Sequence, residues 1–378
     1  MARKLNTNSI DFDAGWQRLM SLSCRDISEL QRSLGIPDEE LEKLETVQDT
    51  FPLLANPYYL SLIDPDDPDD PIRRMCLPSE EELDAAGMAD TSGEALSTVL
   101  PGLQHKYSET ALALSNAHCA INCRHCFRRR FVGTSYEEVV QSIDEVAAYV
   151  AEHPEITNVL VTGGDAFMNG NEVIRKYLEL LTPIDHLRFI RFGTRTPVAL
   201  PQRITSDPEL VEMLVEFGKR KQLFVVTQFN HPAEITPEST AAVRALLHAD
   251  VPVRNQTVLL RGVNDSSETL VQLMNGLAEI GVIPYYVFQC RPVIGVKNRF
   301  QVPLQEGLRI VEQSQANLNG PAKCFRFMMS HKTGKIEILG QLEGSDTMLF
   351  KYHQARDRSD LGKLFELTLP PDTCWLDL

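Results

Sequence analysis

Six short apolar runs alternate with six amphipathic windows between about residues 110 and 315, and this alternation constrains the fold more than any other feature. The runs are rich in β-branched and aromatic residues, as at 159–162 and 223–227. The windows instead repeat apolar residues at helical spacing. Because parallel strands need crossover connections, regular strand–helix alternation predicts a parallel sheet with right-handed crossovers.

The expected elements form six strand–helix units. We expect strands at residues 111–115, 159–162, 187–192, 223–227, 253–260 and 285–290, and helices at 136–152, 171–181, 207–218, 237–247, 266–280 and 304–315. Six units are fewer than the eight of a closed TIM barrel. The pattern therefore predicts an α/β fold, either a partial (β/α)6 TIM-like barrel or a doubly wound sheet. In both folds, ligands bind at the carboxyl ends of the strands.

The segments that flank the alternation differ from it. Residues 26–35 fit a short helix that ends at a glycine, while the Pro/Asp run at 64–71 excludes a regular element. The last segment is β-rich, and we expect a hairpin there with Thr333-Gly334 in its turn. We divide the chain into a helical and irregular N-terminal collar (1–105), the partial barrel (106–318) and a C-terminal tail (319–378), which holds either a cofactor lysine or a dimer contact.

The composition is ordinary for a soluble globular protein, with 43% hydrophobic and 24% charged residues. The net charge of −15 argues against a broad nucleic-acid or membrane surface. No run approaches the ~18 apolar residues of a membrane helix, and residues 1–6 lack the apolar stretch of a signal peptide. Five of the eight cysteines are scattered, unlike a secreted disulfide framework. We therefore expect a reducing cytoplasm.

Three cysteines, Cys119, Cys123 and Cys126, lie within eight residues directly after the first expected strand. Thiolates this close can converge on one metal centre, but three ligands complete neither a tetrahedral site nor a four-iron cluster. The open position indicates a reactive centre. The alternative is a structural zinc site with His118 or His125 as fourth ligand, although such sites usually come as two spaced pairs.

Polar or glycine-rich runs also follow four other expected strands, at residues 162–165, 193–197, 228–231 and 289–291. Because the carboxyl ends of parallel strands meet at one edge, these runs and the cysteine loop predict one composite site. Gly163 and Gly164 would let the backbone approach a ligand closely, although an ordinary β–α turn would use them too.

Taken together, these motifs resemble the lysine 2,3-aminomutase family of the radical S-adenosylmethionine (SAM) superfamily. The CxxxCxxC loop, its Phe-Arg-Arg-Arg-Phe continuation and the Gly-Gly-Asp run after the second strand are similar to that family. The resemblance covers about residues 50–300, including the runs at 57–68, 195–197, 229–232, 255–265 and 284–286.

The resemblance implies an isomerase that cleaves SAM at a [4Fe–4S] cluster held by Cys119, Cys123 and Cys126. The resulting 5′-deoxyadenosyl radical would drive 1,2-amino migration on an amino acid bound to pyridoxal 5′-phosphate (PLP). The residues that it places beside SAM are Gly163, Gly164, Asp165, His231 and Gln256. A capping loop before Pro232 is the other interpretation of His231.

The resemblance also implies a PLP site built from Lys106, Tyr107, His125 and Phe288, with Lys335 as the Schiff-base lysine. Lys332 is the second candidate for that bond, and two exposed hairpin lysines are an equally open interpretation. Arg128 would hold the substrate carboxylate, because arginine suits bidentate binding of carboxylates. A solvated run of three arginines is the alternative.

Three residues depart from the family pattern. Lys106 replaces an arginine, and Phe288 replaces a tyrosine, so this ring stacks but forms no hydrogen bond. Arg291 replaces an aspartate that recognises the ammonium group of lysine, and its charge would repel that group. The sequence therefore predicts a substrate with an acidic or neutral distal group, such as glutamate.

Other functions fit parts of the sequence. A radical SAM enzyme without PLP would perform another hydrogen abstraction, and an aminomutase of this kind would act on a lysine of a protein. A zinc-stabilised nucleic-acid binder is disfavoured by the acidic charge. The resemblance implies a small amino-acid substrate, an electron donor such as flavodoxin or ferredoxin, and a homo-oligomer, without nucleic-acid or membrane partners.

Overall fold

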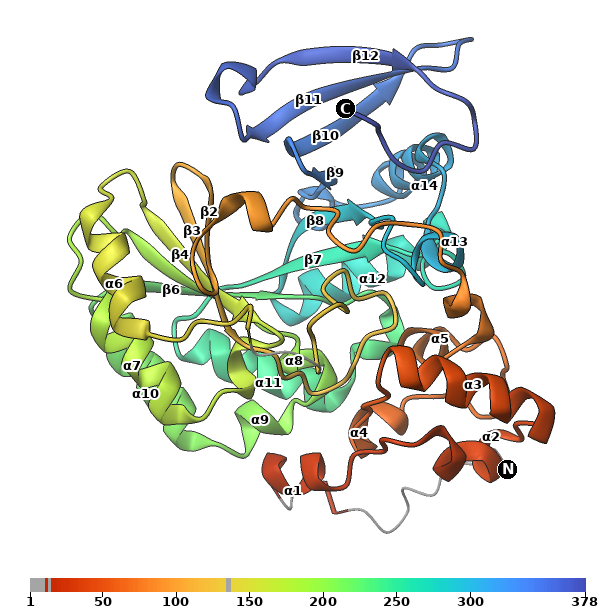
Figure 1. Cartoon of the computed structure of the whole chain (residues 1–378), viewed down its shortest axis with the longest axis horizontal. Coiled ribbons are helices and arrows are strands. Elements are labelled where there is room, and N and C mark those ends of the chain that lie inside the picture. The colour runs from red at the N-terminus through yellow and green to blue at the C-terminus, as the bar shows by residue number, and fades with distance from the viewer. Residues whose placement is uncertain (1–10, 13–14, 134–136) are drawn as a thin grey trace.

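The computed structural model describes residues 11–12, 15–133 and 137–378, and its framework is one sheet of twelve strands that follow one another in chain order. The sheet is open, because its edge strands β1 and β12 do not pair with each other within the described ranges. Figure 1 shows the N-terminal helices at lower right and β10–β12 as a separate layer at the top. The expectation for residues 1–6 lies outside the described residues.

Seven consecutive strands run parallel and form the centre of the sheet. They are β3 (Thr110–Asn116), β4 (Asn158–Gly163), β5 (Phe189–Gly193), β6 (Gln222–Thr227), β7 (Val253–Leu259), β8 (Ile283–Gln289) and β9 (Arg326–His331). The first six confirm the predicted strands, although β5 begins two residues later than expected. The parallel strand β9 adds a seventh.

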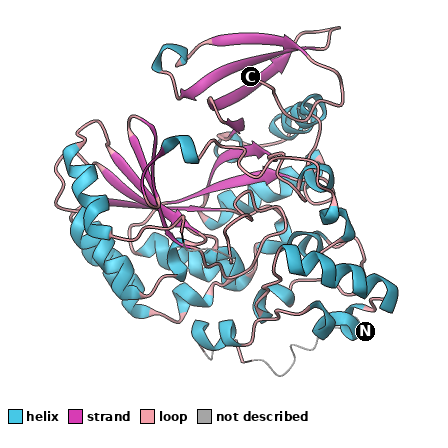
Figure 2. Ribbon diagram, in the orientation of Figure 1, coloured by secondary structure: helices cyan, strands magenta, loops and turns pink. Residues whose placement is uncertain are grey.

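The predicted helices follow these strands along their outer side (Figure 2). They are α6 (Ile143–Glu152), α7 (Asn171–Leu181), α10 (Pro208–Gly218), α11 (Pro237–His248), α12 (Ser267–Ile280) and α14 (Leu304–Ala316). Local signals set their starts: the Ser266 hydroxyl accepts a hydrogen bond from the Thr269 amide at 3.1 Å, and Pro208 opens α10 after the cap Asp207. A doubly wound sheet would carry helices on both faces, whereas the inner face here lines a cavity.

The first predicted helix, at 136–152, is wrong at its start. The helix α6 begins at Ile143, where the Ser142 hydroxyl accepts a hydrogen bond from the Glu145 amide at 3.2 Å. The Val140 amide donates instead to the Leu114 carbonyl at 2.7 Å, so this segment is held against β3. Tyr136 lies outside the described residues.

Antiparallel strands extend both edges of the sheet. The strands β1 (Thr98–Leu100) and β2 (Leu103–Tyr107) pair on the β3 side, in a range predicted to be helical and irregular, and β2 crosses the expected boundary at 105. At the other edge lie β10 (Gly334–Gln341), β11 (Thr347–Ala355) and β12 (Leu364–Thr368). The predicted hairpin joins β9 to β10, but its turn is Lys332-Thr333, and Gly334 already belongs to β10.

The N-terminal collar is built from short helices. They are α1 (Trp16–Ser21), α2 (Gln31–Leu34), α3 (Asp38–Thr50), α4 (Pro57–Leu60) and α5 (Pro71–Cys76). The predicted helix at 26–35 is a 3-10 turn followed by α2, and it ends at Gly35, whose φ of 66° is left-handed. Three further short helices lie outside the collar: α8 (Thr196–Ala199), α9 (Gln202–Thr205) and α13 (Lys297–Phe300).

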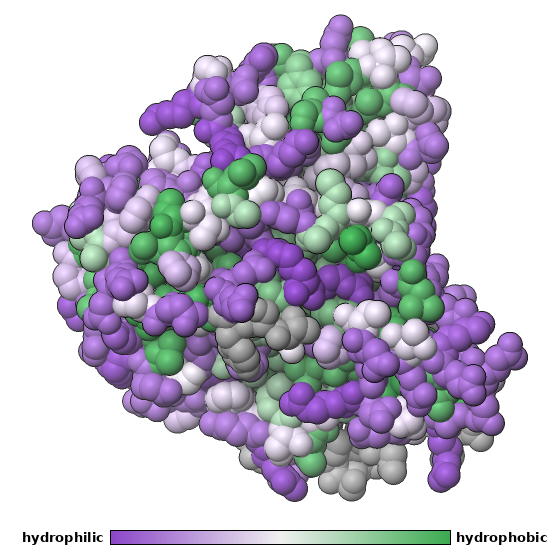
Figure 3. All heavy atoms as spheres, viewed as in Figure 1, coloured by the Kyte–Doolittle hydropathy of each residue, from purple (hydrophilic) through white to green (hydrophobic). Residues whose placement is uncertain are grey.

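The molecular surface in Figure 3 is mostly hydrophilic, with small, separate apolar patches. In the part of the chain that the structure describes, no helix has the length and apolarity needed to cross a membrane.

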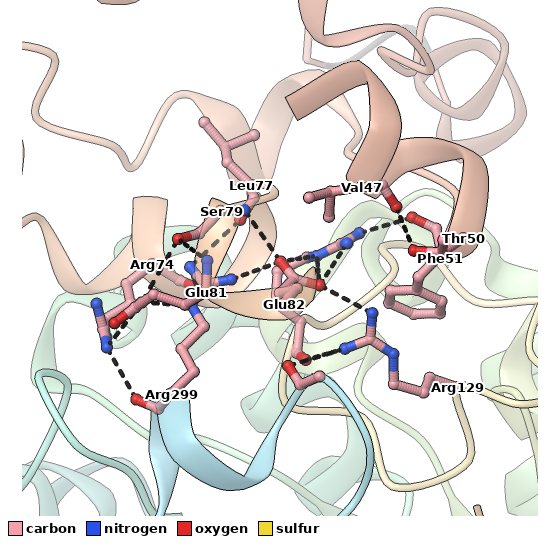
Figure 4. Close-up of polar contacts among 12 residues, drawn as sticks. Val47, Thr50, Phe51, Arg74, Leu77, Ser79, Glu81, Glu82, Arg129 and Arg299 are labelled. Atoms are coloured by element: carbon pink, nitrogen blue, oxygen red, sulfur yellow. Dashed lines mark hydrogen bonds and ion pairs between the residues drawn. The ribbon is translucent and has the colours of Figure 1, made fainter. Parts of the chain in front are cut away.

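One buried carboxylate, Glu82, joins the collar to the cysteine loop. It accepts hydrogen bonds from Arg124 at 2.6 Å, Arg129 at 2.9 Å and Arg299 at 2.5 Å, and Figure 4 labels Glu82 with Arg129 and Arg299. The Glu82 and Arg124 side chains are both 0% exposed. Burial alone would raise the pKa of Glu82, but the three guanidinium groups, Arg124 foremost, outweigh burial and lower it.

Replacing Glu82 by glutamine (Glu82→Gln) should lower the free energy of unfolding by about 3 kcal/mol, because three buried guanidinium groups lose their counter-charge. Denaturant unfolding measures this loss, and Glu81→Gln is the matched control, since the Glu81 side chain is 49% exposed. Because the folded-state pKa of Glu82 lies below the unfolded value of about 4.3, its contribution is present at neutral pH and is lost as the pH falls. Equal losses in the two variants would contradict this role.

Candidate active site

A cavity of about 600 Å³ lies against the inner face of the parallel strands. Side chains alternate between the two faces of a strand, so Arg254, Gln256 and Val258 of β7 line the cavity while the residues between them are buried on the helix side. The cysteine loop, the strand ends and the β10 strand complete the wall. One space is therefore shared by segments far apart in the sequence.

The cavity wall contains all the main candidate site residues from the sequence except His231, while the alternatives Lys332 and His118 lie outside it. It includes Cys119, Cys123, Cys126, Gly163, Gly164, Asp165, Gln256, Lys106, Tyr107, His125, Phe288, Arg128, Arg291 and Lys335. The His231 ring instead accepts a hydrogen bond from the Ala233 amide at 3.2 Å, and the Glu234 carboxylate accepts one from the His231 amide at 3.0 Å. This geometry fits the capping interpretation of His231. The chemical roles of the residues in the wall stay predictions.

The three clustered cysteines lie in the loop after β3 and face the cavity. Within the described ranges, no three His, Cys, Asp or Glu side chains converge closely enough to bind one metal ion. A four-iron cluster bonds each cysteine to a different iron, and the role of the three cysteines as its ligands stays a prediction.

A buried guanidinium, Arg195, faces this loop. Its Nη1 donates to the Cys123 sulfur at 2.9 Å, and its Nη2 donates to the Glu234 carboxylate at 2.5 Å. Its backbone amide donates to the Asp165 carboxylate at 2.6 Å. Burial opposes the charge, but Cys123, Tyr59 and Glu234 outweigh it and raise the pKa of Arg195. A fixed positive charge therefore lies beside Cys123. The sequence signals for Arg195 were its position at a strand end and the run at 195–197 in the family resemblance.

Gly163 and Gly164 bring the end of β4 against the cysteine loop. A Cβ atom at residue 164 would lie 2.2 Å from the His118 carbonyl oxygen, and one at residue 163 would lie 2.3 Å from that of Asn116. The Gly164 amide donates to the Asn116 carbonyl, and the Asp165 amide to the His118 carbonyl, both at 2.7 Å. These glycines are therefore needed for contact between two backbone segments, a role separate from the predicted approach to a ligand.

The cavity wall is strongly basic. Its two acids are already engaged: Glu94 pairs with Arg128 at 2.9 Å and Arg130 at 2.7 Å, while Asp165 accepts backbone amides. Burial would raise the pKa of Glu94, but Arg128 and Arg130 lower it to about 2. The remaining basic residues in the wall are Lys106, Arg191, Arg195, Arg254, Arg291 and Lys335. Such an excess of positive charge attracts anionic ligands.

Lys335, the second residue of β10, has the environment of a nucleophilic amine. Its Nζ lies 5.1 Å from the centre of the Tyr286 ring. Burial, with added repulsion from Arg191, Arg291 and Lys106, lowers its pKa to about 7. A substantial share of this amine is therefore neutral at pH 7, the form that attacks a carbonyl. Lys332, the other candidate, is exposed in the turn.

Arg291 follows β8 and is a cation without a carboxylate bonded to it among the described residues. Its Nη2 donates to the Ser330 hydroxyl at 2.8 Å, and its Nη1 donates to Ser92. Its guanidinium carbon lies 4.0 Å from the centre of the Phe127 ring. Burial lowers the pKa of Arg291 to about 10, so it is still charged at neutral pH.

The sequence of this chain is similar to those of known radical SAM proteins. The model of the Radical SAM superfamily matches residues 115–274. A protein of Aquifex aeolicus (strain VF5), provisionally named L-lysine 2,3-aminomutase, is 41% identical over 344 residues, 90% of this chain and 91% of that protein. The L-lysine 2,3-aminomutase of Clostridium subterminale is 40% identical, covering 78% and 70%. The glutamate 2,3-aminomutase of Clostridioides difficile (strain 630) is 37% identical, covering 89% and 79%.

The close contact at Gly164 gives a testable prediction. In Gly164→Ala the new methyl group would overlap the backbone at His118, so we expect a loss of about 2 kcal/mol in unfolding free energy. We also expect less iron bound after anaerobic reconstitution, because the cysteine loop shifts. Gly320→Ala is the control, since a Cβ there meets no atom within 4 Å. If the two variants match in stability and iron content, the docking role is wrong.

Proposed function

The chain belongs to the lysine 2,3-aminomutase family of radical SAM enzymes, and from this premise we propose that it moves the amino group of a free acidic amino acid to the adjacent carbon. The family consists of isomerases that use a [4Fe–4S] cluster, SAM and PLP. One observation carries the proposal: the three loop cysteines and Lys335 line the same basic cavity.

The cavity wall fits these groups. When bound, the cluster supplies the electron that cleaves SAM, and PLP supplies the aldehyde that activates the amino group. Cys119, Cys123 and Cys126 would hold the cluster. Lys335 would bond PLP, and the buried Nδ1 of His125, which has no hydrogen-bond partner among the described residues, would meet a polar atom of a ligand.

The remaining candidates would divide between SAM and the ring of PLP. We assign Gly163, Gly164 and Asp165 to the SAM side, because they lie at the end of β4 that borders the cysteine loop. Gln256, at the middle of β7 in the same wall, is assigned there from the family resemblance. Lys106, Tyr107 and Phe288 would surround PLP. The ammonium of Lys106 donates to the carbonyls of Ser92 at 3.0 Å and His331 at 2.7 Å, which fixes its place. His231 is assigned to capping alone.

The substrate is proposed from charge. A dicarboxylic amino acid brings two carboxylates, and the wall offers Arg128 and Arg291 for them. The Arg291 cation would repel the side-chain ammonium of lysine. The energy of this repulsion is larger inside a protein than in water, because less water screens the two charges. A relative is named glutamate 2,3-aminomutase, and that name supports the proposal of an acidic amino acid as substrate.

We also propose that the six strand–helix units form a partial (β/α)6 barrel around this cavity. Its inner face would hold the reacting groups, and the antiparallel strands β10–β12 would supply Lys335 from outside the units. A flavodoxin or ferredoxin would deliver the electron, and two or more copies of the chain would assemble.

PLP attachment tests the use of that cofactor. Lys335→Ala should abolish the visible absorbance of bound PLP, whereas Lys332→Ala, which alters an exposed turn, should retain it. In the unaltered enzyme, the rate of attachment should rise with pH through about 7 and then level off, because the pKa of Lys335 is lowered to about 7 and the neutral amine dominates above it. Loss of the band in Lys332→Ala alone would refute Lys335 as the attachment site and move the bond to Lys332. Absence of the band from the unaltered enzyme would refute the use of PLP and leave PLP-free hydrogen abstraction as the alternative.

Substrate selection tests the role of Arg291. In an anaerobic reaction with equal glutamate and lysine, we expect β-glutamate to form faster than β-lysine. Arg291→Gln should lower kcat/KM for glutamate about 10- to 100-fold, the range for a lost charged hydrogen bond. Arg175→Gln, on the outer helix α7, is the control with normal turnover. Faster turnover of lysine by the unaltered enzyme would overturn the proposed substrate.

A further inference from the structure

Two arginines in the cavity wall, Arg191 and Arg254, have no role in the proposed function so far. Arg191 is the third residue of β5, and its Nη2 donates to the Asn158 side-chain oxygen at 2.6 Å. Arg254 is the second residue of β7, and no hydrogen bond or ion pair joins it to another described side chain. The Nε atoms of both arginines are buried without a hydrogen-bond partner among the described residues.

Aromatic rings hold Arg254 in place. Its guanidinium carbon lies 5.1 Å from the centres of both the Phe224 and the Tyr285 rings. Cation–π contact restrains and partly desolvates a guanidinium, but it uses none of its five N–H donors. Arg254 is therefore a positioned cation whose donors are open toward the cavity.

Arg191 and Arg254 lie in a different part of the cavity from the basic residues near the cysteine loop. Arg254 lies near the amino-terminal end of β7 and Arg191 at the middle of β5, whereas the cysteine loop follows the carboxyl end of β3. Arg191 is close enough to Arg254 and to Lys335 for its charge to act on both. The two acids of the wall, Glu94 and Asp165, pair elsewhere. Two neighbouring, half-buried cations without a carboxylate partner favour binding of an anion.

We propose that Arg191 and Arg254 form a subsite for a phosphate dianion, and that it takes the phosphate monoester of PLP. The subsite rests on the proposed function, because Lys335 in the same wall would hold the aldehyde end of that molecule. A phosphate monoester carries nearly two negative charges at pH 7, which match two guanidinium groups, and arginine binds phosphate oxygens through paired N–H donors.

A carboxylate of the substrate is the other anion with suitable chemistry. Arg128 and Arg291 offer N–H donors on the cysteine-loop side, where the substrate has to meet the radical, although Glu94 already offsets the charge of Arg128. Arg191 and Arg254 lie away from the strand ends that border this loop. Their position therefore favours phosphate at this end of the cavity.

The test compares PLP with pyridoxal, which lacks the phosphate, on PLP-free full-length enzyme. Binding is followed by the absorbance of the aldehyde joined to the protein. Arg254→Met should weaken PLP binding tenfold or more and leave pyridoxal binding unchanged, while Arg254→Lys should be intermediate. Arg244→Met, on the exposed side of α11, is the control and should behave as the unaltered enzyme. Equal loss of PLP and pyridoxal binding in Arg254→Met would overturn the subsite.

Competition by inorganic phosphate provides a second test, which does not depend on whether the Arg254→Met variant folds. On the unaltered enzyme it should compete with PLP and leave pyridoxal binding unaffected; competition with both aldehydes, or with neither, would refute the subsite. If neither PLP nor pyridoxal binds, the proposed use of PLP fails. Calorimetric titration of the unaltered enzyme with inorganic phosphate then tests the phosphate subsite separately. Heat of phosphate binding that is smaller in Arg254→Lys than in the unaltered enzyme, and that glutamate does not change, supports the subsite. Absence of that heat, or displacement of phosphate by glutamate, would overturn the phosphate assignment.

Discussion

The buried carboxylate of Glu82 is the interaction on which the position of the cysteine loop depends. Arg124 lies between Cys123 and Cys126, and Arg129 follows the last cysteine, so one acid holds both sides of the loop. The third partner, Arg299, comes from α13, beyond β8. Uncompensated guanidinium groups at this depth would be costly. The collar therefore supplies, through Glu82, the negative charge that allows the arginines of the cysteine loop to be buried against the sheet.

A second acid repeats this principle inside the cavity. Glu94, also from the collar, neutralises Arg128 and Arg130. Among the wall cations without a carboxylate partner, Arg291 lies near the cysteine loop, Arg191 at the middle of β5 and Arg254 near the start of β7, while Lys106 donates to backbone carbonyls. Burial, with added repulsion from Arg191, Arg291 and Lys106, lowers the pKa of Lys335 and favours the neutral amine that a carbonyl-binding lysine requires. A chain of net charge −15 thus encloses a cationic interior suited to anionic ligands.

The sequence predicted elements whose signals are local. Apolar periodicity located the six central strands, and caps such as Ser266 and Asp207 located helix starts. The strand β1 has only three residues, too few to show alternation, and the window at 136–152 had helical periodicity although its first part is held against β3. Glu82 and Glu94 were missed because their partners lie 42 and 34 residues away. Arg254 became a candidate only once strand register showed which face it occupies.

The central claim is that a radical formed at the cysteine-loop end reaches an amino acid held at the Lys335 end of one cavity. Transfer of deuterium tests it most directly, with glutamate deuterated at its β-carbon, SAM, PLP and a reductant under anaerobic conditions. We expect deuterium in the 5′-deoxyadenosine that forms, since a shared cavity lets the radical take hydrogen from the substrate. Formation of 5′-deoxyadenosine without deuterium, while β-glutamate accumulates, would contradict the claim.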